Sequence, residues 1–316
     1  MTSTPDQTTR GVLLAFAAFA VFSFSDASVK LIGGKLPPYE SAFFGAVFAL
    51  AITPFLLNRG DRWRDIFVTA DRPLWLVRFF AYPVGVIGSV TAFTYLPMAE
   101  AFILIFLQPA FITIMSVVFL KEKVGVRRWG AVAIGFIGVL VVLRPGFREL
   151  SIGHLGALFA GFSGSVSVVA FRAIGAREKH VSLFGAGILG AIVVCGLLTV
   201  PDFVAPDAIQ WAELAGYGLL AAFANVLTIH AARHAPGAYI GPTQYSQMLW
   251  AILLGYLLFG DGVDLPMLAG MVLIVGSGLL TLVREKARGT PLPPSVSGER
   301  QVPAVLAPEG QPGPAS

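Results

Sequence analysis

Long apolar segments recur along the whole chain, and they constrain its fold more than any other feature. Each has about 17–25 residues, the length that an α-helix needs to cross a hydrocarbon core of about 30 Å. Backbone groups inside lipid must bond to one another, so segments of this length are expected to be helices. The sequence predicts ten spans: 11–33, 39–57, 75–95, 100–120, 128–144, 153–174, 182–200, 212–232, 238–259 and 265–284.

The composition agrees with a membrane protein. Of the 316 residues, 56% are hydrophobic and 13% are charged, whereas soluble domains carry about 25% charged residues. The mean hydropathy is +0.77. The single cysteine, Cys195, excludes an intrachain disulfide. The predicted fold class is therefore an all-α membrane protein with ten transmembrane helices.

Lysine and arginine are distributed unevenly between the two sides that ten alternating helices define. Eighteen of the 22, Arg78 among them, fall on the side of the chain termini. Positive residues concentrate in cytoplasmic loops, so both termini are predicted to be cytoplasmic in a bacterial-type inner membrane. This asymmetry accounts for the net charge of +4 without a nucleic-acid partner. The four on the other side are Lys30, Lys35, Arg144 and Arg148.

The ends of the chain are expected to lie outside the bundle. Residues 1–10 are polar and are predicted to be disordered. The apolar run after Arg10 is too long for the hydrophobic region of a signal peptide, so it is predicted to remain as a span. The tail 289–316 is rich in proline, glycine and serine and is predicted to be disordered.

Two stretches of the sequence recur in its second half. "SFSDASVKLIGG" (23–34) aligns with "SVSVVAFRAIGA" (165–176), so Lys30 matches Arg172. "FLKEKVGVRRWGAVAIGFIGVL" parallels "LFGDGVDLPMLAGMVLIVGSGLL" at a shift of about 139–140 residues. Five spans in each half give the halves opposite senses in the membrane. The sequence therefore predicts two inverted repeats, 11–147 and 152–286, with a site between them.

The segment "YLPMAEAFILIFLQPAFITIMSVVFLKEKVGVRRWGAVAIGFIGVLVVLRPG" resembles the first-half signature of the ten-span, EamA-like group of the drug/metabolite transporter superfamily. "RHAPGAYIGPTQYSQMLWAILLGYLLFGDGVD" is similar to the second-half signature. The resemblance implies an inner-membrane carrier for amino acids, nucleoside-like or flavin-like metabolites, or drugs. Two positions depart from the pattern. Gly45 stands where members often carry a basic residue, and Met248 stands opposite the proline of "LQPAF".

Asp26 lies within the first apolar segment, where an unshielded carboxylate costs about 2.5–3.5 kcal/mol at a bilayer centre. Two interpretations are open. Lys30, one turn further along the same helix face, pairs with Asp26 and shields it. Alternatively, Asp26 faces a central gap and binds a cationic group or takes up a proton. Asp26 and Lys30 are therefore the candidate ion-coupling residues.

Other polar side chains within the spans are candidate ligands of a small organic substrate. "QYSQMLW" (244–250) combines amide and phenol groups with an aromatic face, as small-molecule sites do. Pro109 and Pro242 each remove one helix hydrogen bond and are expected to kink their helices. For Gln and Tyr, hydrogen bonding between helices is the alternative. With Asp26, the candidates are Gln108, Asn225, Gln244, Tyr245, Gln247 and Trp250.

Two further expectations concern smaller groups. Serines recur at matching positions of the first and sixth spans, such as Ser23 and Ser165, and suggest that these two helices face each other. Glu100 is interpreted as a solvated carboxylate at a helix start, close to the outer boundary.

Two other classes of protein compete with a transporter. "GFSG" (161–164) and His234 resemble parts of a rhomboid-type serine hydrolase, but Ser163 lies in mid-span and His234 in a turn. A non-transporting membrane subunit or receptor is the second alternative. Without metal-ligand spacing, a Walker loop or a nucleotide fingerprint, no metal site, cofactor or catalytic residue is predicted. The expected protein, a monomer or homodimer in the lipid bilayer, moves an amino acid or a riboflavin-like or S-adenosylmethionine-like compound with possible proton coupling.

Overall fold

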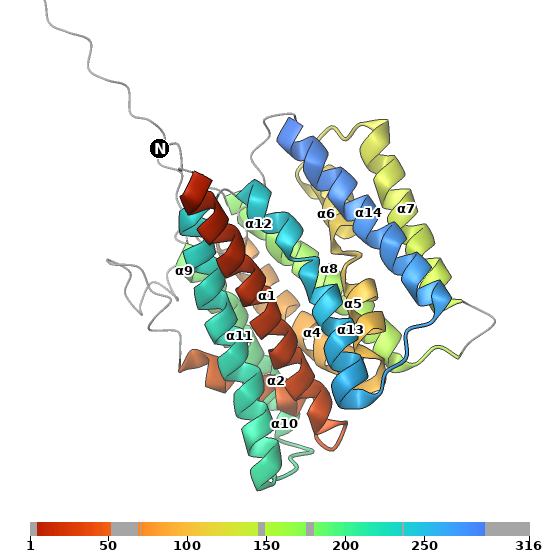
Figure 1. Ribbon diagram of the computed structural model, residues 1–316. Coiled ribbons are helices and arrows are strands. Elements are labelled where there is room, and N and C mark those ends of the chain that lie inside the picture. Colours follow the sequence, from red (N-terminus) through yellow and green to blue (C-terminus); the bar gives the residue numbers. More distant parts are fainter. Residues whose placement is uncertain are drawn as a thin grey trace, which may run out of the picture.

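The computed structural model describes residues 5–51, 69, 71–144, 149–174, 180–235 and 237–287, and every regular element among them is a helix. Figure 1 shows these helices as one bundle. The first half contains α1 (Pro5–Ile32), α2 (Pro38–Leu50), α4 (Arg72–Tyr95), α5 (Met98–Ile105), α6 (Gln108–Phe119) and α7 (Val126–Leu143). The second half contains α8 (Ile152–Ile174), α9 (His180–Gly190), the π-helical turn η3 (Ala191–Cys195), α10 (Gly196–Thr199), α11 (Ala208–His234), α12 (Gly237–Thr243), α13 (Ser246–Phe259) and α14 (Leu265–Ala287).

Helices occupy all ten predicted segments, as far as the described residues extend. Among the described residues, six helical stretches are long and apolar enough to cross a membrane. Segment 39–57 is described only as far as residue 51, and the tail 289–316 lies outside the described residues. The six stretches are Gln7–Ile32, Arg72–Tyr95, Met98–Phe119, Val126–Leu143, Ile152–Ala170 and Ala208–His234.

The first helix begins earlier than the sequence predicted. α1 starts at Pro5, so residues 5–10, which the sequence assigned to a disordered N-terminus, belong to the helix. Proline suits the first turn of a helix because the N–H group that it lacks has no intrahelical acceptor there. Polar residues can thus extend the helix beyond the apolar segment.

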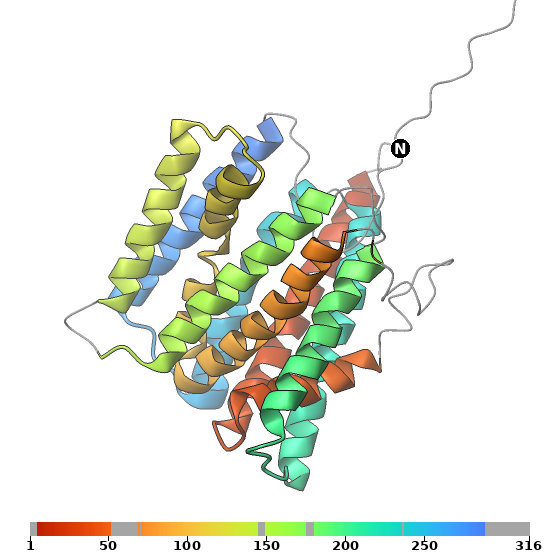
Figure 2. The same ribbon diagram turned by 180° about the vertical axis from the view of Figure 1, so that it is seen from behind.

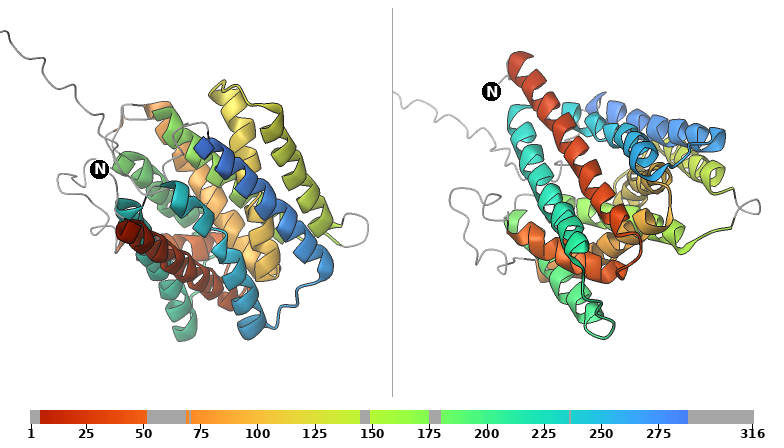
Figure 3. Two further views of the ribbon diagram at one scale, coloured as in Figure 1. Left: turned by 45° about the horizontal axis from the view of Figure 1, so that its top comes forward. Right: turned by 60° about the horizontal axis from the view of Figure 1, so that its bottom comes forward.

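The two ends of the bundle are distinct. α1 begins and α14 ends at one end, the upper end in Figure 1, which we term the terminal end. α1 ends and α14 begins at the opposite end, which we term the far end. Between them α1 packs along α11, and α4 packs along α8 (Figures 1 and 2). α7 and α14 lie side by side at one edge of the bundle (Figure 3).

The serines do not join α1 to α8, as their matching positions had suggested. Ser25 of α1 donates to the Tyr217 carbonyl of α11 at 2.8 Å. Ser165 of α8 donates to the Gln108 carbonyl of α6 at 3.0 Å. Ser23 and Ser165 are both fully buried. The Ser25 and Ser165 hydroxyl groups therefore fasten α1 and α8 to different neighbours.

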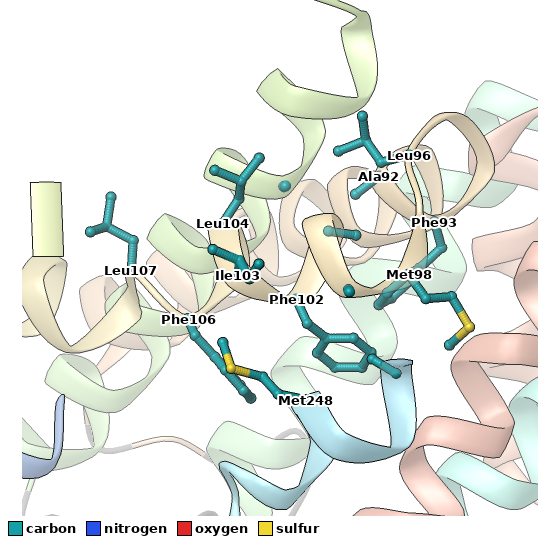
Figure 4. Packing of buried hydrophobic residues seen from close by; sticks show 14 of the residues in the cluster. Ala92, Phe93, Leu96, Met98, Phe102, Ile103, Leu104, Phe106, Leu107 and Met248 are labelled. Atoms are coloured by element: carbon teal, nitrogen blue, oxygen red, sulfur yellow. The ribbon is translucent and has the colours of Figure 1, made fainter. Parts of the chain in front are cut away.

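The core surrounds α5. Every residue from Met98 to Leu104 is buried, and α5 contacts α4, α7, α8, α13 and α14. Figure 4 shows the side chains of Phe102 and Phe106 lying beside Met248 of α13. Residues of both halves thus share one apolar core.

Prolines interrupt this bundle where the sequence predicted kinks. The fourth predicted span divides into α5 and α6 at Phe106 and Leu107, just before Pro109. The ninth divides into α12 and α13 at Gln244 and Tyr245, just after Pro242. A proline lacks the N–H group that would bond to the carbonyl four residues earlier. Each of these two prolines therefore marks a break in the α-helical hydrogen-bond pattern, one in each half.

Candidate functional site

The two helix breaks meet inside the bundle. The ring of Phe106, in the α5–α6 break, lies edge-on to the ring of Tyr245 in the α12–α13 break, with centroids 5.6 Å apart. The Tyr245 hydroxyl lies close against Gly278 of α14, where a Cβ would overlap it. Tyr245 thus connects the break of the second half to α14 and to the break of the first half.

The glutamines lie at these breaks. Gln108 is the first residue of α6, and its half-buried amide lies against Gly164 of α8, where a Cβ would come within 3.0 Å of Nε2. Gln244 is half-buried within the second break. Gln247, in the first turn of α13, is buried. The predicted amide ligands therefore gather where regular helical bonding stops.

Asp26 belongs to a different part of the interior. Its side chain is half-buried, and within the described part of the chain it forms no ion pair or hydrogen bond. Tyr217 of α11 lies within electrostatic range of Asp26 and of Tyr82 from α4. Asp26 is thus partly accessible on α1, with the phenol group of Tyr217 in its surroundings.

Lys30 does not pair with Asp26, so the shielding interpretation is wrong for this conformation. Its Nζ lies 2.9 Å from Oδ2 of Asp261, in the α13–α14 connection, and donates to the Leu96 carbonyl at 2.8 Å. The same Asp261 oxygen accepts from the Met98 backbone N–H at 2.9 Å. Lys30 also lies 5.0 Å from the centroid of the Phe259 ring. The end of α1 is thus joined to both halves at the far end.

Glu100 is also placed differently from the prediction. It is fully buried rather than solvated, and its Oε1 lies 3.1 Å from Nε2 of His154, which is 3% exposed. The Ser151 backbone N–H donates to Nδ1 of His154 at 2.9 Å. That acceptor role places the ring proton on Nε2, directed at Glu100. This carboxyl group at a helix start therefore contacts the opposite half instead of water.

Further polar contacts join the two halves at the far end. Arg144, after α7, pairs with Asp264, before α14. The Tyr39 hydroxyl donates to Asp202 at 3.1 Å. The Val204 backbone N–H donates to Glu40 at 3.1 Å. With Lys30–Asp261 and Glu100–His154, these contacts hold the halves together at this end.

Asn225 and Trp250 make local contacts. Asn225 is half-buried, and its amide donates to the Ala221 carbonyl of its own helix at 2.9 Å. Trp250 packs against Phe24 of α1 with centroids 6.3 Å apart. The described contacts do not connect either residue with Asp26 or with the two helix breaks.

Three residues of α4 and α11 escaped the sequence analysis as candidates. Arg78 was assigned to the cytoplasmic boundary by charge counting, but it is 3% exposed within α4. Its guanidinium lies over the Tyr82 ring, 5.4 Å from the centroid. Tyr217 approaches from α11. Arg78 and Tyr82 are four residues apart, a spacing that puts both on one helix face and was the available signal.

The two groups of the serine-hydrolase alternative bond elsewhere. The Ser163 hydroxyl donates to the Ala81 carbonyl of α4. Nδ1 of His234 lies 2.8 Å from the His230 carbonyl in its own helix. Among the described residues, no three His, Cys, Asp or Glu side chains are arranged to hold a metal ion.

An apolar helical bundle with a broken helix in each half defines a multi-pass membrane protein of the kind found among transporters. The model of the EamA-like transporter family matches this chain twice, over residues 9–144 and 151–283. The chain belongs to this family.

Several curated relatives align over most of their length. The pseudopaline exporter CntI of Pseudomonas aeruginosa (strain UCBPP-PA14) is 27% identical over 271 residues, which cover 84% of this chain and 93% of the exporter. The S-adenosylmethionine uptake transporter of Rickettsia prowazekii (strain Madrid E) is 23% identical, covering 87% of this chain and 93% of the relative. The riboflavin transporter of Vibrio cholerae is 27% identical, with coverages of 79% and 84%. These relatives are named as transporters of small molecules.

A solved crystal structure supports the fold. It superposes with a TM-score of 0.60 at 17% sequence identity, covering 88% of this chain and 97% of that chain.

Proposed function

We propose that this protein is a secondary transporter that moves a small organic metabolite across a bacterial-type inner membrane by alternating access. The meeting of the helix breaks at Phe106 and Tyr245 is the observation that carries the proposal. In secondary transporters, interrupted helices of two repeats place polar backbone beside the substrate. The names of the relatives favour a metabolite such as an amino acid, a riboflavin-like compound or an S-adenosylmethionine-like compound.

The two halves would be inverted five-helix repeats. The helix boundaries support this arrangement: α5 and α7 begin at Met98 and Val126, and α12 and α14 begin at Gly237 and Leu265, the same interval later in the chain. The double match of the family model is a second, independent support. Rocking of one repeat against the other would then expose the site to each side in turn.

The terminal end of the bundle would face the cytoplasm. Eighteen of the 22 lysines and arginines were assigned to that side from the sequence. Arg78 is buried within α4 and so contributes little to this asymmetry. The other seventeen lysines and arginines assigned to that side maintain the asymmetry. The far end, with its polar contacts between the halves, would face outwards.

The candidate residues divide into two roles. Asp26 would bind a cationic group or take up a proton, because it is half-buried without an ion-pair partner in the described structure. Lys30, one turn further on, would change partners as the far end opens. The groups that would orient the substrate by hydrogen bonding or stacking are Gln108, Asn225, Gln244, Tyr245, Gln247 and Trp250.

Flux through the purified chain tests the proposal and separates it from a non-transporting subunit. A thermal-shift screen against amino acids, flavins and S-adenosylmethionine selects ligands, and uptake of each radiolabelled hit into proteoliposomes follows, with and without a pH gradient. We expect at least one stabilising ligand to accumulate, and protein-free liposomes to remain empty. Stabilising ligands that never cross the membrane would contradict transport. Turnover of a ligand to a new product would instead favour an enzyme.

A further inference from the structure

A buried hydroxyl group directly after the second helix break has no hydrogen-bond partner among the described residues. It belongs to Ser246, the first residue of α13, which is 7% exposed. An unpaired polar group in the interior lowers the stability of a protein, and native structures contain few of them. The Ser246 hydroxyl group is therefore available to a bound molecule.

Other buried hydroxyl groups in these helices are paired. Ser23 and Thr228 each donate to the carbonyl group four residues earlier, at 3.1 and 2.9 Å. Thr243, just before the break, donates to the Ile240 carbonyl at 2.6 Å. Such bonds to the preceding turn are the common solution for serine and threonine within a helix. Ser246 does not use this solution.

The helix break does not by itself require a serine. The carbonyl group four residues before Ser246 is that of Pro242, and it accepts the Tyr245 backbone N–H at 3.2 Å instead. In the first break, Leu107 lies as far from the start of α5 as Ser246 lies from the start of α12. Leu107 is 2% exposed and packs into the apolar core (Figure 4). The polar side chain is thus a separate feature of the second break.

The hydroxyl group lies at the N-terminal end of a regular helix. Because Cα–Cβ bonds tilt toward the N-terminus of a helix, the Ser246 side chain leans back toward the break. α13 has 14 residues, and the N-terminal end of such a helix favours a negatively charged group. The backbone N–H groups of Gln247 and Met248 bond to carbonyl groups within the break. The hydroxyl group, rather than these N–H groups, would therefore make the direct contact.

We propose that the Ser246 hydroxyl group binds a carboxylate of the transported metabolite. A carboxylate only accepts hydrogen bonds, and a hydroxyl group that donates to a charged acceptor forms a stronger bond than it does with a neutral one. The inference rests on the proposed transport function and adds one residue that determines specificity. It favours an amino acid or an S-adenosylmethionine-like compound over a riboflavin-like compound, which has no carboxylate.

Unfolding without ligand tests whether the hydroxyl group is unpaired. Ser246→Ala removes a buried polar atom that has no partner, so the unfolding temperature in detergent should stay constant or rise by up to about 4 °C. Ser25→Ala is the matched control, because this buried hydroxyl group donates to the Tyr217 carbonyl of α11. Its unfolding temperature should fall. An equal fall in Ser246→Ala would show that the protein itself pairs this hydroxyl group, and would overturn the proposal.

Paired ligands test the carboxylate. The probes are S-adenosylmethionine, L-methionine and L-phenylalanine, each measured beside an analogue without the carboxylate: decarboxylated S-adenosylmethionine, methioninamide and phenylalaninamide. Isothermal titration gives each Kd. We expect at least one acid to bind the parent more tightly than its analogue, and Ser246→Ala to reduce this preference by about tenfold or more. Leu249→Ala, on the exposed side of the same helix, should keep the preference of the parent.

The outcomes separate the carboxylate contact from the transport function. The proposal is overturned if no acid of the panel binds the parent, if each analogue binds as tightly as its acid, or if Ser246→Ala keeps the full preference. A preference that depends on Ser246, without flux of any ligand into proteoliposomes, would retain the contact and reject the transporter. Flux of riboflavin alone would retain the transporter and reject the contact.

Discussion

The rings of Phe106 and Tyr245 meet edge to face with centroids 5.6 Å apart, and each ring belongs to a break in a helix. Edge-to-face contact suits two aromatic quadrupoles and fixes the relative positions of the rings. One break lies in each half of the chain, and elements of both halves pack around α5. The contact therefore couples the two irregular segments through the apolar core.

The carbonyl group freed by Pro109 has a glycine neighbour, which gives a first prediction. Pro109 leaves the Ile105 carbonyl without its helical donor, and a Cβ on Gly161 would lie 2.8 Å from that oxygen. Gly161→Ala should therefore lower the free energy of unfolding by about 1–3 kcal/mol, the cost of overpacking. Unfolding in detergent, followed by circular dichroism, measures this change.

The matched control for Gly161 is Gly130 in α7. No atom lies within 4 Å of the position where its Cβ would stand, so Gly130→Ala relieves the low helix propensity of glycine at no steric cost. We expect this variant to be as stable as the parent or more stable. Equal destabilisation by both substitutions would show that the contact with Ile105 is unimportant.

Asp26 provides the second prediction, which concerns coupling. Asp26→Asn preserves the size and shape of the side chain but removes the carboxylate that we propose takes up a proton. We expect the variant to fold normally and to lose the uptake driven by a pH gradient by at least about tenfold, because intramembrane carboxylates are the usual proton carriers of transporters. Asp26→Glu should retain part of the pH response. Full flux with unchanged pH dependence in Asp26→Asn would assign a structural role to Asp26.

The helices and their breaks were predictable because their signals are local. Segment length and hydropathy located the spans, and Pro109 and Pro242 marked the interruptions within a few residues. The partner of Lys30 was not predictable in this way. The local spacing favoured Asp26, whereas the structure pairs Lys30 with Asp261, which is 231 residues away.

Burial was the second limit of sequence reasoning. Glu100 and Arg78 both lie near helix ends, where charges are usually solvated, yet both are buried. Their burial depends on the rotation of α5 and α4 about their axes and on neighbours such as His154. A charge pattern along one helix contains no information about that rotation, so the contacts between the halves emerge only from the three-dimensional arrangement.

The third prediction tests the buried contact between the halves. His154→Ala removes the Nε2 donor that lies 3.1 Å from Glu100. Loss of a hydrogen bond to a buried polar group costs about 1–3 kcal/mol, so the unfolding temperature in detergent should fall by several degrees. His230→Ala is the control, since His230 is exposed and contacts its own helix. If both substitutions have the same small effect, the Glu100–His154 pair does not stabilise the bundle.

The last prediction concerns substrate binding at the first helix break. Gln108 presents a half-buried amide at the start of α6, beside the groups that would contact a substrate. Gln108→Ala should remove one neutral hydrogen bond to the ligand, worth about 0.5–1.5 kcal/mol, and so weaken the Kd by about 2- to 13-fold. Leu249→Ala is the matched control, because this side chain of α13 is 69% exposed on the outside of the bundle and should leave the Kd unchanged. Isothermal titration with the ligand found in the thermal-shift screen measures both constants. An unchanged Kd in Gln108→Ala would mean that this glutamine only ties α6 to α8.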